Sequence, residues 1–384
     1  MTVAEIITIG TELLLGETVD TNTRFIARRL RGLGVDLYRT LTVGDNTERI
    51  AEAVRQAMGR ADVVITTGGL GPTVDDPTRQ AIAQAAGTQL EFHPELWEQI
   101  VQRIQRYGRE PGENQKRQAY IPRHARVIEN PVGTAPAFIV ESRRGMVICL
   151  PGVPNEMETL LDQAVLPYLK QRFDLRALIK VRTLHVSGIG EGSLDELVGD
   201  LETLANPTVG LTAHSGVVDV RIAAKATEEA EADRMITAVE TDLRTRLGAN
   251  VFGSDDENLE GVTLNAASAR GWSVSCLESG LDGALLTRLA RSGHPAYRNG
   301  SSRTVAPDGL AEAADAQRRA SGASVCIAVA LTSGMDRQEI ALVLAGPFGQ
   351  QERRLTYGGH PRNAPRWATN AALDALRRLA LEIR

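Results

Sequence analysis

The chain has 384 residues, of which 42% are hydrophobic and 24% are charged, and its formal net charge is −5. Such a chain is long enough for two or three domains of roughly 100 to 200 residues each, which excludes a single small core. The slightly acidic balance gives the chain no overall attraction to nucleic acid or to an anionic membrane, so a small-molecule ligand is favoured.

The cysteines and the N-terminus indicate the compartment. Cys149, Cys276 and Cys326 lie singly in apolar runs without metal-ligand spacing, which is typical of reduced, buried thiols. The N-terminus lacks the basic region of a signal peptide, and no apolar stretch approaches the roughly 20 residues of a membrane span. These features predict a cytoplasmic protein.

Residues 3 to about 170 alternate short β-branched runs with helical periodicity, which predicts a βαβαβα order and a mainly parallel sheet. Helix starts are predicted at Asp20 or Thr21, at Asn46 or Thr47, and at Asp76 with Pro77 in the first helical position. A further helix is expected over 94–108. A Pro-rich irregular stretch (121–138), a strand (145–152) and a helix entered through Pro154 and Asn155 complete this part.

Near residue 170 the pattern changes to a smaller α+β module, with strands in 178–188 and 209–226 and helices in 193–205 and 228–248. The polar, Gly-flanked segment 253–261 is predicted to be a linker. Beyond it we expect a third α/β pattern, a hairpin within 339–359 and an amphipathic helix that begins near Arg366.

The segment Thr67 to Asp76, TGGLGPTVDD, connects a predicted strand to a predicted helix. Gly68, Gly69 and Gly71 let backbone N–H groups approach phosphate oxygens without interference from Cβ atoms, at the positive end of a helix. A tight turn between a strand and a helix also needs glycine for its geometry alone, so a purely structural role stays open.

Two carboxylates follow the glycines, and they would repel a phosphate unless a cation lay between them. Mg²⁺ and similar hard cations take one or two carboxylates together with phosphate oxygens. Because Asp76 directly precedes Pro77 and Thr78, it also has the position of a helix N-cap, so Asp75 is the preferred metal ligand.

Other polar residues follow the expected strand ends, where an open parallel sheet binds its ligand. Each of them alone also fits a helix cap or a surface charge. They are Glu12, Asp45, Asn46 and Glu156, with Asp20 and Asn22 at the edge of a helix.

Five segments resemble the CinA family of competence/damage-inducible proteins: GTELLLGETVDTN (10–22), GDN (44–46), TTGGLGPTVDD (66–76), NPVGTAP (130–136) and LPGVPNEM (150–157). The first domain of that family is related to molybdopterin-binding domains of the MogA/MoaB type. The resemblance therefore implies a three-layer α/β domain over 1–170, a small α+β, KH-like connecting domain over 171–253 and an α/β, amidase-like domain over 254–384.

For the first domain, the resemblance implies a metal-dependent ADP-ribose pyrophosphatase that releases AMP and ribose 5-phosphate. It implies a divalent cation (Mg²⁺, Mn²⁺ or Co²⁺), K⁺ as an optional addition, and a homodimer. In that function Asp75, Glu12 and Asp45 are the catalytic candidates, and Asp75 and Asp76 the metal candidates. The residues expected to contact substrate are Gly68, Gly69, Gly71, Pro72, Thr73, Asn22, Asn46, Asn130, Thr134, Pro151, Gly152 and Glu156.

The middle module also allows an RNA-binding interpretation, since KH-type units clamp RNA through a GXXG loop. Its last helix is acidic, and the segment 188–191 lacks basic flanks, so a structural connector is favoured.

The last domain departs from the family pattern, in which a nicotinamide-nucleotide amidohydrolase uses a serine, a tyrosine and a lysine. Ser279 and Tyr297 remain, but Leu281 and Asp282 replace a Thr-Gly pair, and no lysine follows Lys225. The position where relatives carry lysine holds Ser302 or Arg303, and arginine is not deprotonated in proteins. We therefore expect a degenerate amidase site without deamidase activity.

Two alternatives to the pyrophosphatase stay open. In the first alternative, the first domain binds a pterin or a nucleotide and releases it unchanged, as the MogA/MoaB resemblance permits. An active nicotinamide mononucleotide deamidase in the last domain is less favoured, because a serine without an activating base is a weak nucleophile.

Overall fold

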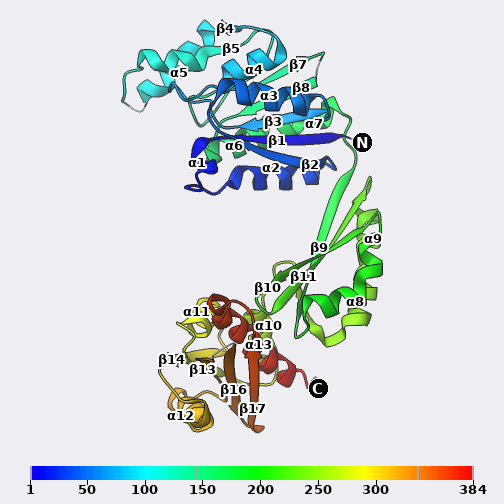
Figure 1. The fold of residues 1–384 in the computed structure, drawn as a ribbon, viewed down its shortest axis with the longest axis vertical. Helices are drawn as coiled ribbons and strands as arrows, with labels where there is room; N and C mark the ends of the chain where they lie inside the picture. Colours follow the sequence, from blue (N-terminus) through cyan, green and yellow to red (C-terminus); the bar gives the residue numbers. More distant parts are fainter. Residues whose placement is uncertain (1, 107, 144, 335–336, 383–384) are drawn as a thin grey trace. The chain divides into compact units, whose positions relative to one another are not determined.

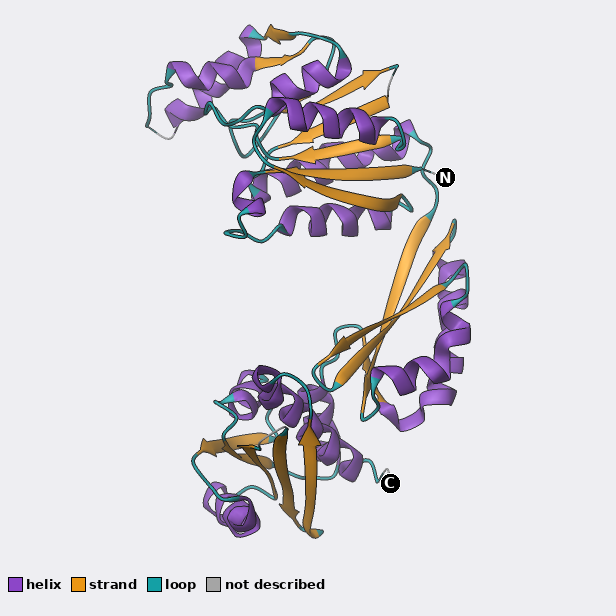
Figure 2. Ribbon diagram, viewed as in Figure 1, coloured by secondary structure: helices purple, strands orange, loops and turns teal. Residues whose placement is uncertain are grey.

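The computed structural model describes residues 2–106, 108–143, 145–334 and 337–382 (Figures 1 and 2). The chain forms two compact units, of which the first comprises residues 1–180 and 225–232 and the second comprises residues 181–224 and 233–384. Within the described ranges, no helix combines the length and the apolar character that crossing a membrane requires.

The first unit is built on a six-stranded sheet in the order β2-β1-β3-β8-β7-β6. Strands β2, β1, β3 and β8 are parallel, whereas β7 and β6 are antiparallel, so the prediction of a mainly parallel sheet is confirmed. The strands are β1 (Val3–Ile9), β2 (Asp36–Val43), β3 (Val63–Thr67), β6 (Arg126–Ile128), β7 (Ala137–Ser142) and β8 (Gly145–Leu150).

Helices cover both faces of this sheet, as Figure 2 shows, which confirms the three-layer α/β arrangement. Alternate residues of a strand point to opposite faces, so Ile7 packs with one helical layer and Ile6 with the other. One layer holds α3 (Thr47–Met58), α4 (Thr78–Ala86) and α5 (Pro94–Arg106); the other holds α2 (Thr21–Gly32), α6 (Pro154–Leu160) and α7 (Leu166–Arg172). The short helix α1 (Thr11–Leu14) and the two-stranded pair β4 (Leu90–Phe92) and β5 (Tyr120–Pro122) complete the unit.

The stretch 121–138 is less irregular than its sequence predicts. Its first residues belong to β5, and β6 and the start of β7 lie further along it. Strand β6 is a short edge strand that pairs only with β7 in the described sheet, and edge positions tolerate nearby prolines because one side of the strand needs no ladder hydrogen bonds. The prolines of this stretch therefore led to a prediction of irregular structure where the chain forms the short edge strand β6.

Two of the three predicted helix caps are present. Asp20 accepts a hydrogen bond from the amide of Thr23 at 2.9 Å, and Asn46 accepts one from the amide of Arg49 at 3.0 Å. The prediction that Asp76 caps α4 is wrong: Pro77 occupies the N-cap, and Asp76 instead accepts a hydrogen bond from the amide of Thr73 at 2.8 Å. The carboxylate turns back because Thr73 offers it both an amide and a hydroxyl donor.

The second unit begins with an α+β module whose four-stranded sheet has the order β10-β11-β9-β12. Strands β9 and β11 and helix α9 run across the boundary between the two units. The elements are β9 (Leu178–Ser187), α8 (Glu191–Glu202), β10 (Thr208–His214), β11 (Val217–Ala226), α9 (Glu229–Leu247) and β12 (Val251–Ser254).

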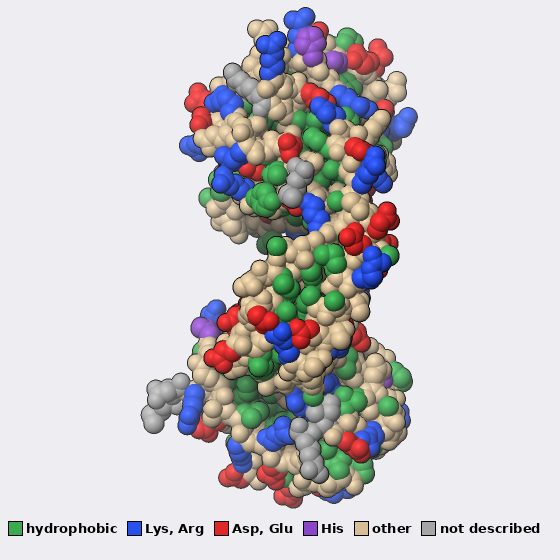
Figure 3. Space-filling model, turned by 90° about the vertical axis from the view of Figure 1, so that its right-hand side faces the viewer, with side chains coloured by type: hydrophobic (Ala, Val, Ile, Leu, Met, Phe, Trp, Pro, Cys, Tyr) green, Lys and Arg blue, Asp and Glu red, His purple; other side chains and the backbone are tan. Residues whose placement is uncertain are grey.

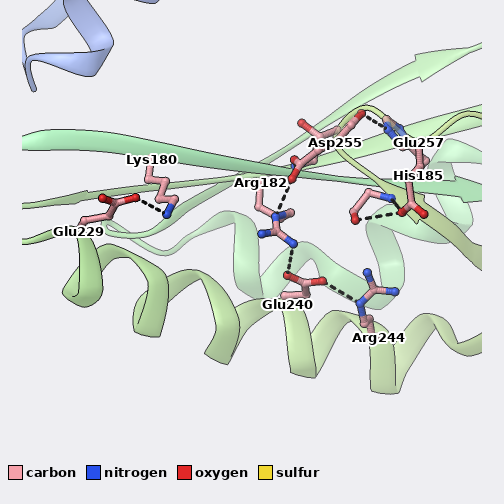
Figure 4. A network of polar contacts seen from close by, with 10 residues as sticks. Lys180, Arg182, His185, Glu229, Glu240, Arg244, Asp255 and Glu257 are labelled. Carbon is pink, nitrogen blue, oxygen red and sulfur yellow. Dashed lines mark hydrogen bonds and ion pairs between the residues drawn. The ribbon is translucent and has the colours of Figure 1, made fainter.

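The prediction of a linker over 253–261 is wrong, because β12 and helix α10 (Leu259–Ala269) enter this segment from either side. Between them, Asp255 accepts a hydrogen bond from the amide of Thr183 at 2.9 Å and pairs with Arg182 at 2.9 Å. Figure 4 shows Arg182 between Asp255 and Glu240, which binds Arg244 in turn. The polar residues that suggested a flexible linker therefore hold a tight turn.

The rest of the second unit is an α/β module with a five-stranded sheet in the order β14-β13-β15-β16-β17. The predicted hairpin is confirmed as β16 and β17, and the predicted last helix as α13. The strands are β13 (Val274–Ser279), β14 (Tyr297–Ser302), β15 (Val325–Ser333), β16 (Gln338–Gly346) and β17 (Gly349–Tyr357); the other helices are α11 (Ala284–Arg291), α12 (Leu310–Ser321) and α13 (Ala364–Ala380).

The surface charges and the buried cysteines agree with what the composition predicts. On the face drawn in Figure 3, basic and acidic side chains are interspersed rather than gathered by sign. The three cysteines are buried and free, as the sequence predicts, and burial raises the pKa of each thiol to about 12. They therefore act as small apolar side chains rather than as nucleophiles.

Candidate functional site

The glycine-rich loop that follows β3 has a backbone that only glycine adopts readily. Gly68 and Gly69 have φ angles of 109° and 63°. A Cβ atom at Gly68 would overlap the carbonyl oxygen of Ile9, and one at Gly69 would overlap the hydroxyl of Thr78. The amide of Gly68 donates to the carbonyl of Leu150 at 3.1 Å, which ties the loop to the end of β8. Glycine is thus required at both positions.

Three consecutive amides of this loop have no acceptor. The N–H groups of Gly69, Leu70 and Gly71 donate to no atom in the described ranges of the chain. Backbone donors are normally paired in folded proteins, and successive unpaired amides form concavities that bind anions. The loop therefore offers the donors that a phosphate group would accept from.

Arg79 supports the same loop from inside the protein. Its side chain is 4% exposed and donates to the carbonyls of Leu70 at 2.7 Å and Gly71 at 2.5 Å. Burial lowers the pKa of Arg79 to about 10, so the guanidinium stays charged at neutral pH. In a trans peptide the N–H points away from the preceding carbonyl, so Arg79 orients the Gly71 amide through the Leu70 carbonyl. Thr78 orients the Gly69 and Leu70 amides in the same way, through the carbonyls of Gly68 and Gly69.

Asn22 joins this loop to the loop after β8. Its Nδ2 atom donates to Thr67 Oγ1 at 3.0 Å and to the carbonyl of Gly152 at 2.8 Å, while Thr67 donates to the carbonyl of Pro151 at 2.9 Å. A Cβ atom on Gly152 would lie 3.2 Å from the Cα atom of Gly68. Asn22, Pro151 and Gly152 thus meet the glycine-rich loop at the carboxyl end of strands β3 and β8.

The predicted acidic residues have different environments. Asp75 is exposed, and the nearby Thr73 side chain lowers the pKa of its carboxyl group, although the Thr73 hydroxyl itself donates to Asp76. Asp45 accepts hydrogen bonds at 2.8 Å from both the amide and the hydroxyl of Thr11. Glu12 is exposed, with its carboxylate beside Gly10. Asp75 is thus an ionised carboxylate that is open to solvent, while Asp45 is engaged in local structure.

These carboxylates do not gather into a preformed metal cage. Within the described residues, no group of three or more His, Cys, Asp or Glu side chains is placed to hold an ion. Asp76 Oδ2 is already shared by the amide and the hydroxyl of Thr73. This arrangement fits only a cation held by one or two carboxylates and completed by ligand phosphates.

The remaining candidates lie around the site in supporting positions. Asn46 uses its side-chain oxygen to cap α3, and Asn130 is 4% exposed and bonded to its own loop and to Glu156. Thr134 lines a cavity of about 100 Å³ between α5 and the loop 130–136. Pro72 lies in the glycine-rich loop and Thr73 bonds Asp76.

Two functional candidates escaped the sequence analysis, Arg79 and Arg103. Arg103 donates to the carbonyls of Asn130 and Gly133, as Arg79 does in the first loop. A signal for Arg79 exists in the sequence, because it precedes the buried Ile82 and Ala83 by three and four residues and so lies on the apolar face of α4. A charged residue on such a face needs a buried partner.

In the last module, the predicted degenerate amidase residues do not contact each other. Ser279 Oγ donates to the carbonyl of Val305 at 3.2 Å and accepts from its amide at 3.0 Å. Tyr297 contacts Cys276 Sγ at 3.5 Å, and burial raises the pKa of its phenol. A cavity of about 1250 Å³ in this unit is lined by α13, by β17 and by the turns before α8 and β11, and neither Ser279 nor Tyr297 lines it.

Comparison with known proteins places these features in a family. Residues 5–171 match the family model "Probable molybdopterin binding domain", and residues 181–253 match "Damage-inducible protein CinA KH domain". A protein of Alkaliphilus oremlandii named as competence-damage inducible is 37% identical, and the alignment covers 98% of each chain. A protein of Halothermothrix orenii with the same name is 35% identical over 96% of each chain.

A solved structure is also similar in sequence. The crystal structure of the protein CinA, of unknown function, from Thermoplasma acidophilum is 38% identical, covers 43% of this chain and 98% of its own, and has a TM-score of 0.40. The two family models and the nearly full-length relatives lead to one conclusion: the chain belongs to the CinA family of competence-damage inducible proteins.

Proposed function

We propose that the first domain hydrolyses ADP-ribose or a similar nucleoside diphosphate, releasing AMP and ribose 5-phosphate, with the help of a divalent cation. The observation that supports this most is the row of amides at Gly69, Leu70 and Gly71, which have no acceptor among the described residues and are oriented by Thr78 and Arg79. Preorganised donors of this kind bind phosphate and stabilise the charge that develops on it during hydrolysis.

A cation fits beside this loop if phosphate oxygens supply most of its ligands. Asp75 is the residue that would hold it, because its carboxylate is exposed and its pKa is lowered. A bound divalent cation would neutralise charge on the diphosphate and polarise a phosphoryl oxygen. Mg²⁺, Mn²⁺ and Co²⁺ all accept such a set of oxygen ligands.

The first test replaces Asp75 by Asn in the full chain, with Glu91→Gln as the control for the lost charge on an exposed acid. We expect the wild type to release AMP from ADP-ribose with one of the three cations. Asp75→Asn should lower that rate at least about 100-fold, because the cation loses its protein ligand. Chromatography of the products gives the rates. A wild type that releases no AMP with any of the cations contradicts the proposal.

A second candidate function is binding without turnover. The match of residues 5–171 to a molybdopterin-binding model, together with the lack of a gathered acidic cluster in the described residues, favours it. Calorimetry with ADP-ribose and with a phosphorylated pterin separates the two functions. Tight binding from which the ligand is recovered intact supports the binder.

For the last domain we propose a structural role in homodimer formation rather than deamidation. The hydroxyl of Ser279 is bonded to the backbone of Val305, and the chain has no lysine after Lys225. Light scattering of the full chain tests the dimer.

A further inference from the structure

Glu156 carries a carboxylate with one oxygen held and the other open. It lies in the first turn of α6, half-buried, and its Oε2 atom accepts a hydrogen bond from Asn130 Nδ2 at 2.6 Å. Its Oε1 atom has no hydrogen-bond partner in the described ranges. The carboxylate is therefore oriented by one contact and still has an acceptor to offer.

The side-chain amide of Asn130 makes all its hydrogen bonds within the protein. Its Oδ1 atom accepts from the amides of Val132 at 3.1 Å and Gly133 at 2.9 Å, and its Nδ2 atom also donates to the carbonyl of Ala135 at 2.9 Å. With the bond to Glu156, all four hydrogen-bonding positions of the amide are used. Asn130 thus cannot also bind a ligand through its amide, and its effect on the site runs through Glu156.

Backbone packing fixes the same carboxylate. A Cβ atom on Gly133 would overlap both oxygens of Glu156, so the carboxylate rests against bare backbone. Arg103 holds that backbone through the carbonyls of Asn130 and Gly133. The positive charge of Arg103, on the neighbouring helix α5, also lowers the pKa of Glu156.

The register of the sheet places Glu156 at the end of the sheet where the glycine-rich loop lies. Strand β7 runs antiparallel to β8 and Phe138 lies opposite Cys149, so the loop 130–136 precedes β7 at the carboxyl end of β8. The loop between β8 and α6 meets the glycine-rich loop where Gly152 approaches Gly68. Glu156 follows that contact by four residues.

We propose that Glu156 is the general base of the hydrolysis proposed above, and that Asn130 is the residue that positions it. This inference rests on the proposed function. Glu156 Oε1 accepts a proton from a water molecule as the water oxygen forms a bond to one phosphorus of the diphosphate. The bond from that phosphorus to the bridging oxygen breaks, and the electron pair leaves on the phosphate of the other product. The proton then passes from Glu156 to solvent.

The environment of Glu156 suits this role. Burial raises the pKa of its carboxyl group, which outweighs the opposing effects of the Asn130 hydrogen bond and the Arg103 charge. A raised pKa makes the carboxylate a stronger base, and general-base catalysis is most effective when the pKa approaches the working pH.

The experiment measures ADP-ribose hydrolysis by the full chain as a function of pH. Glu156→Gln should lower kcat by roughly 100- to 10,000-fold with KM nearly unchanged, and the fall of kcat at low pH should disappear. Asn130→Ala should shift that fall to higher pH, because the hydrogen bond it removes lowers the pKa of Glu156. Glu158→Gln, with the same charge change on the same helix, should match the wild type.

A second readout does not depend on activity. The raised pKa means that the folded protein binds a proton at Glu156 more tightly than the unfolded chain does, so this group lowers stability as pH rises above its usual range. Glu156→Gln should therefore unfold at a higher temperature than the wild type at pH 7 and at the same temperature at pH 4. If the wild type and Glu156→Gln unfold at the same temperature at pH 7 as well as at pH 4, the pKa of Glu156 is not raised and the proposal is contradicted.

The outcomes separate this inference from the proposed function. A wild type without AMP release contradicts both. An active wild type whose kcat is unchanged in Glu156→Gln contradicts only the role of Glu156. A low-pH fall that moves when Mg²⁺ is exchanged for Mn²⁺ or Co²⁺ assigns the titration to cation-bound water and overturns the inference as well.

Discussion

Two glycine-rich loops of this chain differ in the charged side chains that contact them. The loop after β3 and the loop after β13 each connect a buried parallel strand to a helix, and each contains two glycines with positive φ, Gly68 and Gly69 in one and Gly280 and Gly283 in the other. In the first loop, three amides have no acceptor among the described residues. In the second, the buried carboxylate of Glu278 accepts from the amides of Leu285 and Leu286 at 3.0 and 3.1 Å.

The difference lies in what occupies the positive end of the turn. The loop after β13 places a buried carboxylate at the start of the next helix, whereas the carboxylates of the loop after β3, Asp75 and Asp76, are not buried and its carbonyls are held by a cation, Arg79. A glycine-rich turn is therefore not sufficient for an anion site, because an internal carboxylate can occupy the N-terminal end of the helix that follows it, here through the amides of Leu285 and Leu286. The side chains that face the turn decide whether a phosphate has room to bind.

Replacing Arg79 by Met breaks this comparison most severely. The carbonyls of Leu70 and Gly71 would lose charged donors, and we expect the free energy of unfolding of the first unit to fall by about 3 kcal/mol. ADP-ribose hydrolysis should be lost, since the Leu70 and Gly71 carbonyls, and with them the Gly71 amide, are no longer held. Scanning calorimetry and AMP release measure the two effects.

Arg79→Lys is the matched control, because it keeps the charge but has one ammonium group in place of a guanidinium that reaches two carbonyls. We expect intermediate stability and activity. Full activity in Arg79→Met would show that the loop does not need its buried support.

Gly69→Ala tests the backbone of the first loop alone. The new Cβ atom would overlap the Thr78 hydroxyl at a φ of 63°, so we expect a loss of roughly 2 kcal/mol in stability and a marked loss of nucleotide binding. Gly87→Ala is the control, since Gly87 has a φ of 72° and open space around it. That variant carries only the cost of the left-handed conformation, about 1 kcal/mol. Equal losses in the two variants would contradict the close approach at Gly69.

Asp282→Gly sharpens the comparison from the other side, with the smallest expected effect. Asp282 is exposed and has a φ of 52°, a conformation that glycine adopts without strain. We expect the unfolding free energy of the second unit to rise by up to about 1 kcal/mol, reduced by the greater freedom of glycine in the unfolded chain. Ammonia release from nicotinamide mononucleotide should stay absent. A gain of deamidase activity that Ser279→Ala abolishes would show that Asp282 alone silences the domain.

Local features of the fold were predictable from the sequence, and long-range contacts were not. The caps at Asp20 and Asn46 and the glycine-rich turn depend on residues close together in the chain, so their patterns are visible in sequence. The pairing of Asn130 with Glu156 joins a loop to the first turn of α6, and no spacing rule reveals it. Asp76 was misread because a cap and a backward turn to Thr73 use the same residue types.

The segment 253–261 shows the same limit for polar residues. Glycine and acidic residues in sequence indicate exposure, but here Asp255 binds Thr183, a residue of the distant strand β9. Composition identifies a turn, and only the tertiary structure shows that the turn is hydrogen-bonded to a distant strand.

Asn22 makes the two loops at the sheet edge a single transferable part. Its amide group donates to Thr67 at the entrance of one loop and to Gly152 in the other, from a helix that belongs to neither. Grafting the glycine-rich loop onto a related scaffold will therefore preserve its shape only where the recipient carries an asparagine at this third position. For protein engineering, the smallest portable version of the site is discontinuous, and it includes one residue from a separate sequence motif, 10–22.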